Sequence, residues 1–237
     1  LDIPVQCVYD EVQVPLREID YSQLSEEDFA LTFEKFLTED KKSGFSFEEA
    51  PLFRMTLIHL EEGHTRFVFT HHHIILDGWS VQNIMRGFHA AYIQLETEGT
   101  LPKVALDDFG THLRHISGVN EAKGLLHWKT YLSELALPSY IPFVKDISLR
   151  NKLFGNKKIE FTVNGAIKDF TKKHRITENT FLQGAWIYLL SKYTGNDSVV
   201  FGATVLGRDS KEENIETKVG LYINTIPVCS TVKKDLK

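Results

Sequence analysis

The chain has 237 residues, of which 42% are hydrophobic and 25% are charged. This composition is typical of a globular protein and excludes a disordered or repetitive one. The net charge of −5 disfavours nucleic acid as a partner, and the apolar stretches are too short to cross a bilayer. Two distant cysteines, Cys7 and Cys229, disfavour a disulfide scaffold and fit the reducing cytoplasm.

The first half of the chain predicts a strand, a helix, a hairpin and a second helix. Residues 3–14 alternate loosely, as a strand would, and a capping box at Ser25 starts a helix that ends near Gly44. Residues 52–73 contain two strand patterns around a turn, which indicates a β-hairpin. An apolar stripe of helical period then fills residues 81–97.

In the second half, a stretch with little periodicity separates two groups of elements. The elements expected there are helices over 108–117 and 121–136, a strand over 157–163, a helix from Asn164 to about Lys173, a helix from Thr177 to Gly195, and strands over 198–206 and 221–228. Irregular alternation of strands and helices, with a clear hairpin, predicts a layered α/β fold with a mixed sheet rather than a barrel.

The most informative segment is HHHIILDGWS, residues 71–80, at the end of a predicted strand and the start of a predicted helix. Strand-end loops of this kind carry ligand sites in α/β proteins. Because strand side chains alternate between two faces, three successive histidines cannot converge on one metal while the strand lasts. His59 and His64 supply no obvious further ligands, so we expect no metal site.

Backbone-satisfied, buried histidines are the alternative reading, but that reading leaves Asp77 and Gly78 unexplained. A neutral imidazole can accept a proton near physiological pH, and a fixed carboxylate can hold the surrounding loop. We expect Trp79 to pack at the start of the helix rather than to contact substrate. We expect Ser80 to be the helix N-cap rather than a nucleophile, because no base is placed for it.

Residues 72–78 match the HHxxxDG motif and, extended by Trp79 and Ser80, resemble the condensation domains of nonribosomal peptide synthetases. Further blocks in the same order are also similar to that family, and together they span nearly all of the chain. These blocks are residues 44–47 with 51–54, residues 109–112 with 127–129, and the pair 202–208 and 219–227.

The resemblance implies a chloramphenicol-acetyltransferase-like fold. It would have two subdomains, each a mixed sheet flanked by helices, with the motif in a tunnel at their junction. We assign residues 1–138 to the N-terminal subdomain, residues 139–150 to a linker and residues 151–237 to the start of the C-terminal subdomain. The family's opening blocks are not present and the family continues beyond Pro227, so we expect about the middle half of such a domain, with exposed apolar edges that favour association.

The resemblance also implies the reaction. The amine of an acceptor aminoacyl thioester attacks the carbonyl of a donor thioester, an amide bond forms and the donor thiol leaves. No cofactor would be bound, because both substrates ride on the phosphopantetheine arms of donor and acceptor peptidyl carrier domains, beside neighbours such as an adenylation domain. The attack needs near-attack geometry, a group for the amine proton and donors for the oxyanion.

The family's motif implies a role for each matching residue. His73 would lie beside the attacking amine, as general base or as orienting group, and His72 would support the loop. Asp77 would pair with Arg208 and so tie the two halves together, and Gly78 would keep the tunnel open.

Asn224 lies in the segment that resembles the bridge between the halves, so it would approach the tunnel without carrying a proton. Two other functions stay open. An epimerisation domain shares HHxxxDG but inverts the α-carbon of one tethered residue, and a non-catalytic module would only recruit carrier proteins. The Trp79 and Ser80 continuation favours condensation, of which an ester-forming or small-acceptor variant is also open.

Overall fold

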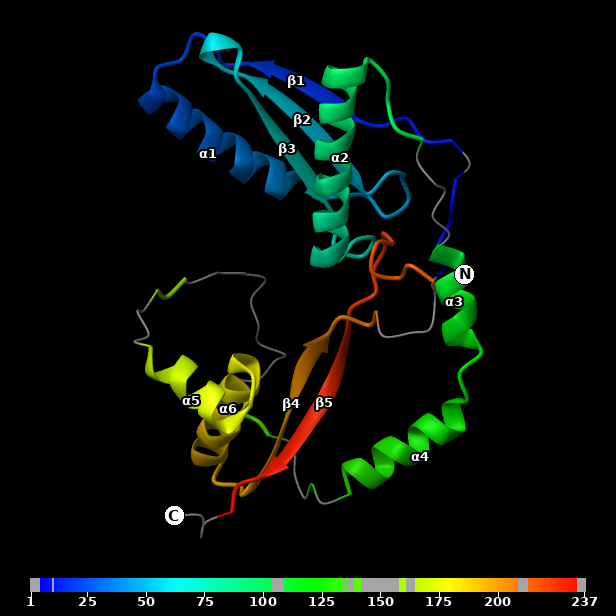
Figure 1. Ribbon diagram of the computed structural model, residues 1–237, viewed down its shortest axis with the longest axis vertical. Helices are drawn as coiled ribbons and strands as arrows, with labels where there is room; N and C mark the ends of the chain where they lie inside the picture. The colour runs from blue at the N-terminus through cyan, green and yellow to red at the C-terminus, as the bar shows by residue number, and fades with distance from the viewer. Residues whose placement is uncertain are drawn as a thin grey trace. The chain divides into compact units, whose positions relative to one another are not determined.

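Figure 1 shows a computed structural model of the chain. It describes residues 5–9, 11–103, 109–133, 135, 139–141, 158–160, 165–208 and 213–233. The chain divides into two compact units, which consist of Leu1–Arg114 with Leu206–Ile223, and of His115–Val205 with Asn224–Lys237. A segment late in the sequence therefore belongs to the first unit. The predicted linker, 139–150, lies almost wholly outside the described residues, so the predicted domain boundaries stay a prediction.

The first unit is built on a three-stranded sheet of order β1–β2–β3. β1 (Leu16–Asp20) pairs in parallel with β2 (Phe53–His59), and β2 pairs antiparallel with β3 (Thr65–His71) across the 3-10 turn Glu61–Gly63. The predicted hairpin is confirmed, and its sheet is mixed as expected. β3 ends at His71, two residues earlier than predicted, so His72 and His73 lie beyond the strand.

The first strand lies later than the predicted 3–14. Its pairing begins where the Met55 amide donates to the carbonyl of Pro15 at 3.0 Å. The valines that suggested a strand before it, such as Val8 at 90% exposure, are exposed and pair with no described strand. Alternation without a partner strand was therefore a misleading signal.

Helices cover both faces of this sheet (Figure 1). α1 (Glu26–Ser43) begins at Ser25, which accepts from the Asp28 amide at 3.2 Å, and ends at Gly44 with φ of 59°, as predicted. On one face the Arg66 guanidinium lies 4.8 Å from a phenylalanine ring of α1. On the other face the neighbouring Phe67 stacks on α2 (Gly78–Glu98) at 5.1 Å, because adjacent strand residues point to opposite faces.

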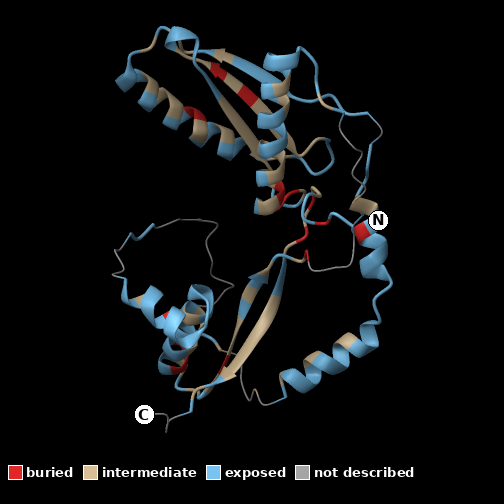
Figure 2. Cartoon of the chain, viewed as in Figure 1, coloured by how far each residue is buried: buried red, intermediate tan, exposed pale blue. Residues whose placement is uncertain are grey.

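Buried residues of the first unit gather in two places (Figure 2). One is the interface between α1 and β2, where Phe36 and Ile58 are buried. The other is the start of α2, where Leu76, Asp77 and Ser80 are buried. The second cluster lies shortly after the three histidines at residues 71–73, which we call the histidine segment. This cluster is unusual because most of its members are polar.

The second unit holds α4 (Glu121–Tyr131), α5 (Ala166–His174), α6 (Glu178–Thr194), β4 (Ser198–Val205) and β5 (Asn224–Thr231), while α3 (Phe109–Ser117) starts in the first. α6 begins at Thr177 and ends at Gly195 in the left-handed conformation, as predicted. Gly165 takes the N-cap position of α5, and the predicted cap Asn164 lies outside the described residues. Residues 158–160 form no strand, although one was expected there.

β4 and β5 form a two-stranded antiparallel sheet within the described residues, so the second predicted mixed sheet has no parallel pair there. β5 begins at Asn224 rather than at Leu221, because the Tyr222 amide donates to Asp77 instead of to a strand. Large apolar side chains are exposed on α6, among them Leu182 at 58%. No helix in the described part of the chain is long and apolar enough to span a membrane.

Candidate active site

The connection from β3 to α2 carries the histidine segment. The His72 amide donates to the Leu52 carbonyl at 2.9 Å, and the Ile75 amide donates to the His72 carbonyl at 3.2 Å. α2 then starts at Gly78, with Asp77 as its N-cap. These backbone bonds fix a tight turn, so the positions of His72 and His73 are set by the turn, whereas His71 is still part of β3.

The three histidines lie in different environments. His71 is half-buried and stacks on Phe69 at 5.3 Å. Burial, followed by the nearby His73 and His72, lowers the pKa of His71, which favours its neutral form. The His72 ring nitrogen Nδ1 accepts from the Ile74 amide at 3.1 Å. His73 is exposed to solvent.

The side chains of the segment do not assemble a metal centre. In the part of the chain that the structure describes, no group of three or more His, Cys, Asp or Glu side chains could hold an ion.

Asp77 is fully buried and accepts hydrogen bonds from several donors. The amide of Ser80 donates to it at 2.7 Å and the amide of Tyr222 at 2.9 Å, and Arg208 Nη2 lies 3.3 Å from Oδ1. Burial would raise the pKa of the Asp77 carboxyl. The two amides and the charge of Arg208 outweigh burial and hold that pKa below its usual value. The ionised carboxylate thus caps a helix and accepts from a distant segment.

Arg208 is the other half of this pair, and its side chain is 3% exposed. Its Nη1 donates to the carbonyls of Ile215 at 2.6 Å and Lys218 at 2.9 Å, and its guanidinium lies 4.1 Å from the centre of the Tyr222 ring. The ion pair with Asp77 that the resemblance implied is therefore present. Both partners belong to the first unit. The pair thus lies within one unit and does not tie two units together, because residues 206–223 cross into the first.

Ser80 does not cap α2, so that prediction was wrong. The reason is that the carboxylate of Asp77 already accepts from the Ser80 amide and takes the N-cap position. The Ser80 hydroxyl is fully buried; it donates to the Gly220 carbonyl at 2.7 Å and accepts from the Gly220 amide at 3.0 Å and from Arg208 at 2.8 Å. Ser80 thus joins α2 to the segment that carries Arg208.

Trp79 is partly buried in the first turn of α2 and makes a specific bond. Its indole Nε1 donates to the Glu216 carbonyl at 2.6 Å. Asn83 Nδ2 donates to the same carbonyl at 2.8 Å. Sequence reasoning missed Asn83, although its place four residues after Trp79 puts both side chains on one helix face. Asp77, Trp79, Ser80 and Asn83 bond to residues 206–223, the late segment of the first unit that contains Arg208. We call these four residues together with that segment the buried clasp.

Two glycines of the buried clasp are required by close approach. Gly207 has φ of 64°, and a Cβ there would lie 1.9 Å from the Tyr222 carbonyl oxygen. A Cβ on Gly220 would lie 2.4 Å from the Phe109 ring. Gly78 differs, because its φ is ordinary and no described atom lies within 4 Å of the position of a Cβ. The described residues give no packing reason for glycine at position 78.

Asn224 is the first residue of β5 and is exposed. Its Oδ1 accepts from the Thr225 amide at 2.7 Å. Asn224 belongs to the second unit and His73 to the first. Its expected approach to a tunnel therefore stays a prediction.

Comparisons with known proteins show the family of the chain. The family model of the condensation domain matches residues 2–237. Bacitracin synthase 3 of Bacillus licheniformis is 31% identical over 241 residues, which span 99% of this chain and 4% of that protein. The chain belongs to the condensation-domain family, which confirms the resemblance of its motifs to the condensation domains of nonribosomal peptide synthetases.

Solved structures show the same fold. The first condensation domain of the CDA synthetase matches with a TM-score of 0.65 at 18% identity, over 94% of this chain and 50% of that one. The epimerization domain from the third module of tyrocidine synthetase B matches with a TM-score of 0.71 at 16% identity, over 95% of this chain and 53% of that one. The chain therefore spans about half of each solved domain, and this fold is common to both kinds of domain.

Proposed function

We propose that this chain supplies the histidine motif for amide-bond formation between two carrier-tethered substrates. The observation that carries the proposal is the exposed His73 ring, held on a turn whose far end is fixed by the buried clasp. No described residue hydrogen-bonds to this ring, so its nitrogens are available to a substrate. A fixed backbone with an accessible imidazole is what proton transfer to or from a tethered amine requires.

The reaction balances without a metal or a covalent enzyme intermediate. The acceptor amine attacks the donor thioester carbonyl, and the new carbon–nitrogen bond forms as the carbonyl becomes an oxyanion. His73 accepts, or orients by hydrogen bonding, the proton that the amine loses. Collapse of the tetrahedral species expels the donor thiolate, which takes up a proton to leave as a thiol.

Binding both substrates on phosphopantetheine arms makes this attack effectively unimolecular, and this proximity can lower the barrier by several kcal/mol. No described atom lies within 4 Å of the position of a Cβ at Gly78, which is compatible with the role implied for this glycine of leaving room for such an arm. Donor and acceptor carrier domains, a neighbouring adenylation domain and a cytoplasmic location complete the proposal.

The buried clasp serves the reaction indirectly. The carboxylate of Asp77 is occupied by the Ser80 amide, the Tyr222 amide and Arg208. It is therefore a positioning residue that fixes where α2 starts, and so where His73 lies. His72 supports the turn in the same sense, through its bond from the Ile74 amide.

The test is product formation by the full-length protein that carries this chain, with loaded donor and acceptor carriers. His73→Ala should lower the rate of amide formation by about 10²-fold to 10⁴-fold, the usual contribution of a general acid–base group. His89→Ala is the matched control, because His89 is another exposed histidine, in the middle of α2 and eleven residues beyond its start. An unchanged rate in His73→Ala would remove His73 from this role.

Epimerisation is the second candidate, since the fold matches an epimerization domain as well as a condensation domain. One loaded carrier without an acceptor, in deuterated water, separates the two. Exchange at the α-carbon would favour epimerisation, and amide product that requires both carriers would favour condensation. Binding of a loaded carrier with neither reaction would indicate a recruiting module.

A further inference from the structure

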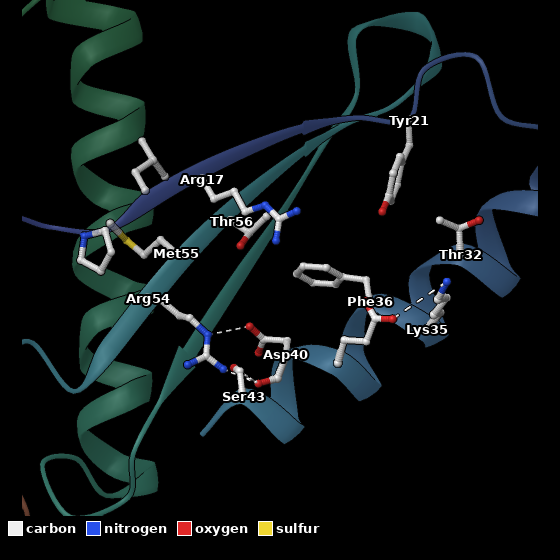
Figure 3. A pocket seen from close by; sticks show the side chains of 13 residues that line it. Arg17, Tyr21, Thr32, Lys35, Phe36, Asp40, Ser43, Arg54, Met55 and Thr56 are labelled. Carbon is white, nitrogen blue, oxygen red and sulfur yellow. Dashed lines mark hydrogen bonds and ion pairs between the residues drawn. The ribbon is translucent and has the colours of Figure 1, made fainter. Parts of the chain in front are cut away.

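A second aspartate–arginine pair lies in the first unit, where Asp40 on α1 meets Arg54 on β2. Arg54 on β2 donates from Nε to Asp40 Oδ1 at 2.6 Å, and its Nη2 donates to the carbonyl of Asp40 (Figure 3). Its Nη1 donates to the Gly44 carbonyl at 2.8 Å. Arg54 thus binds the carbonyls at the C-terminal end of α1, where a cation is favoured by the helix dipole.

The pair is ionised and mostly shielded from solvent. The side chain of Arg54 is 23% exposed and that of Asp40 is 13% exposed. Burial would raise the pKa of Asp40, but hydrogen bonds from Arg54 and Thr70 outweigh burial and lower it. A planar guanidinium can fill these positions with one rigid fork, which a lysine cannot.

Two routes lead from this pair to the histidine segment. Along the first, Thr70 Oγ1 donates to Asp40 Oδ2 at 2.8 Å, which holds β3 one residue before His71. Along the second, the Arg54 guanidinium lies 4.4 Å from the centre of the Phe45 ring. The rings of Phe45 and Phe47 each make an edge-to-face contact with the His72 ring. Their ring centroids lie 6.2 and 4.9 Å, respectively, from the centroid of His72.

The His72 ring passes this restraint to the next peptide. Its Nδ1 accepts from the amide of Ile74, which is joined directly to the His73 carbonyl. A shift of the His72 ring would therefore rotate the peptide that follows His73, and the exposed imidazole would move with it.

We propose that Asp40 and Arg54 are positioning residues for His73 and act through Phe45, Phe47 and His72. The inference rests on the proposed function of His73. Neither Asp40 nor Arg54 touches the reacting atoms. They line an open pocket of about 570 Å³ between α1 and β1–β2, and the lining of that pocket includes no residue of the histidine segment (Figure 3).

The experiment measures amide formation by the full-length protein with loaded carriers, in variants that loosen one link each. Arg54→Lys keeps the charge but loses the fork and the ring contact. Phe47→Leu leaves the ion pair intact and removes a ring contact to His72. Each should lower kcat by about 10-fold to 100-fold, as expected for a misplaced catalytic group, with KM for the carriers unchanged.

Lys35→Gln is the matched control. Lys35 lines the same pocket and forms an ion pair with Glu39 on the same helix, with the two side chains 76% and 67% exposed. Among the described residues neither side chain bonds to Asp40 or Arg54. Its kcat should equal that of the unmodified protein.

Combining Arg54→Lys with His73→Ala separates positioning from general damage. If Arg54 acts through His73, the double variant should be no slower than His73→Ala alone. A loss caused by partial unfolding would instead persist in that background. An unchanged kcat in Arg54→Lys and Phe47→Leu, or equal losses in both backgrounds, would overturn the inference. Absence of amide product from the unmodified protein would contradict the proposed function and not this network.

Discussion

The two aspartate–arginine pairs of the first unit are built differently. The Asp77–Arg208 pair is almost fully buried, its closest charged atoms are 3.3 Å apart, and backbone amides donate the shortest bonds to Asp77. The Asp40–Arg54 pair is partly exposed, and its charged atoms are 2.6 Å apart. The first pair joins segments 131 residues apart, and the second joins segments 14 residues apart.

This difference indicates a division of roles. The buried Asp77–Arg208 pair shares hydrogen bonds with Ser80 and with backbone groups of Ile215, Lys218 and Tyr222, so it fixes the late segment on α2. The partly exposed Asp40–Arg54 pair packs against the Phe45 ring, which contacts His72. It therefore positions the turn that carries His73. We therefore expect changes at Asp77 to act first on stability, and changes at Asp40 to act first on rate.

The largest expected effect is that of Asp77→Ala. It leaves the Arg208 guanidinium buried without its carboxylate and removes the N-cap of α2. The free energy of unfolding should therefore fall by about 3–5 kcal/mol. Denaturant unfolding of the full-length protein measures this loss. A separate proteolysis experiment, in which cleavage within residues 206–223 is detected, reports whether that segment has come off α2. Asp40→Ala is the comparison, and a larger loss there would reverse the assignment of roles.

Ser80→Ala should have the next largest effect. It removes a buried hydroxyl that serves the Gly220 amide, the Gly220 carbonyl and Arg208, so a loss of about 1–3 kcal/mol is expected. Ser133→Ala is the control, because the exposed Ser133 hydroxyl bonds only locally, to the Thr130 carbonyl. Equal unfolding midpoints for the two variants would show that the buried clasp does not depend on Ser80.

Acid should weaken the buried pair in a defined direction. The pKa of Asp77 is lower in the folded state than its ordinary value of 3.8. Its contribution is therefore complete above about pH 3.8 and is lost as pH falls through the lower folded value. The difference in melting temperature between the unmodified protein and Asp77→Asn should be constant from pH 7 to 5 and narrow below pH 3.8. A difference that narrows already near pH 6 would contradict a lowered pKa.

A high salt concentration should have the smallest effect on the rate. It should also distinguish the partly exposed Asp40–Arg54 pair from the buried Asp77–Arg208 pair. Dissolved ions screen exposed charges more than buried ones, so 1 M salt should modestly lower kcat through the Asp40–Arg54 pair. The salt dependence should be weaker in Arg54→Met, which no longer carries the charge. Equal salt dependence in both proteins would indicate that the charge of Arg54 does not matter for the rate.

Local signals in the sequence predicted much of this unit. The cap at Ser25, the helix end near Gly44 and the hairpin over 52–73 each depend on neighbouring residues, and the structure confirms all three. The motif match also placed Arg208 opposite Asp77. These features could be read because each one is either local or carried by a family motif.

The rest depends on contacts that no local pattern encodes. Ser80 and Asp77 both have the chemistry of an N-cap, and only the position of Gly220 shows that the Ser80 hydroxyl is used elsewhere. The link from Asp40 to Phe45 requires the fold of β2 against α1, and the sequence showed Arg54 merely as part of a matching block. Long-range placement of polar side chains was the missing information.

The path of the chain through the two units has a consequence for exchanging parts between condensation domains. Residues 206–223 belong to the first unit, whereas the residues on either side of them belong to the second. A chimera cut once, between the early and late parts of the chain, would pair a native Asp77 and Ser80 with a foreign Arg208, Gly207 and Gly220. Exchanges that respect the units would transplant residues 206–223 together with α2, which requires additional crossover points.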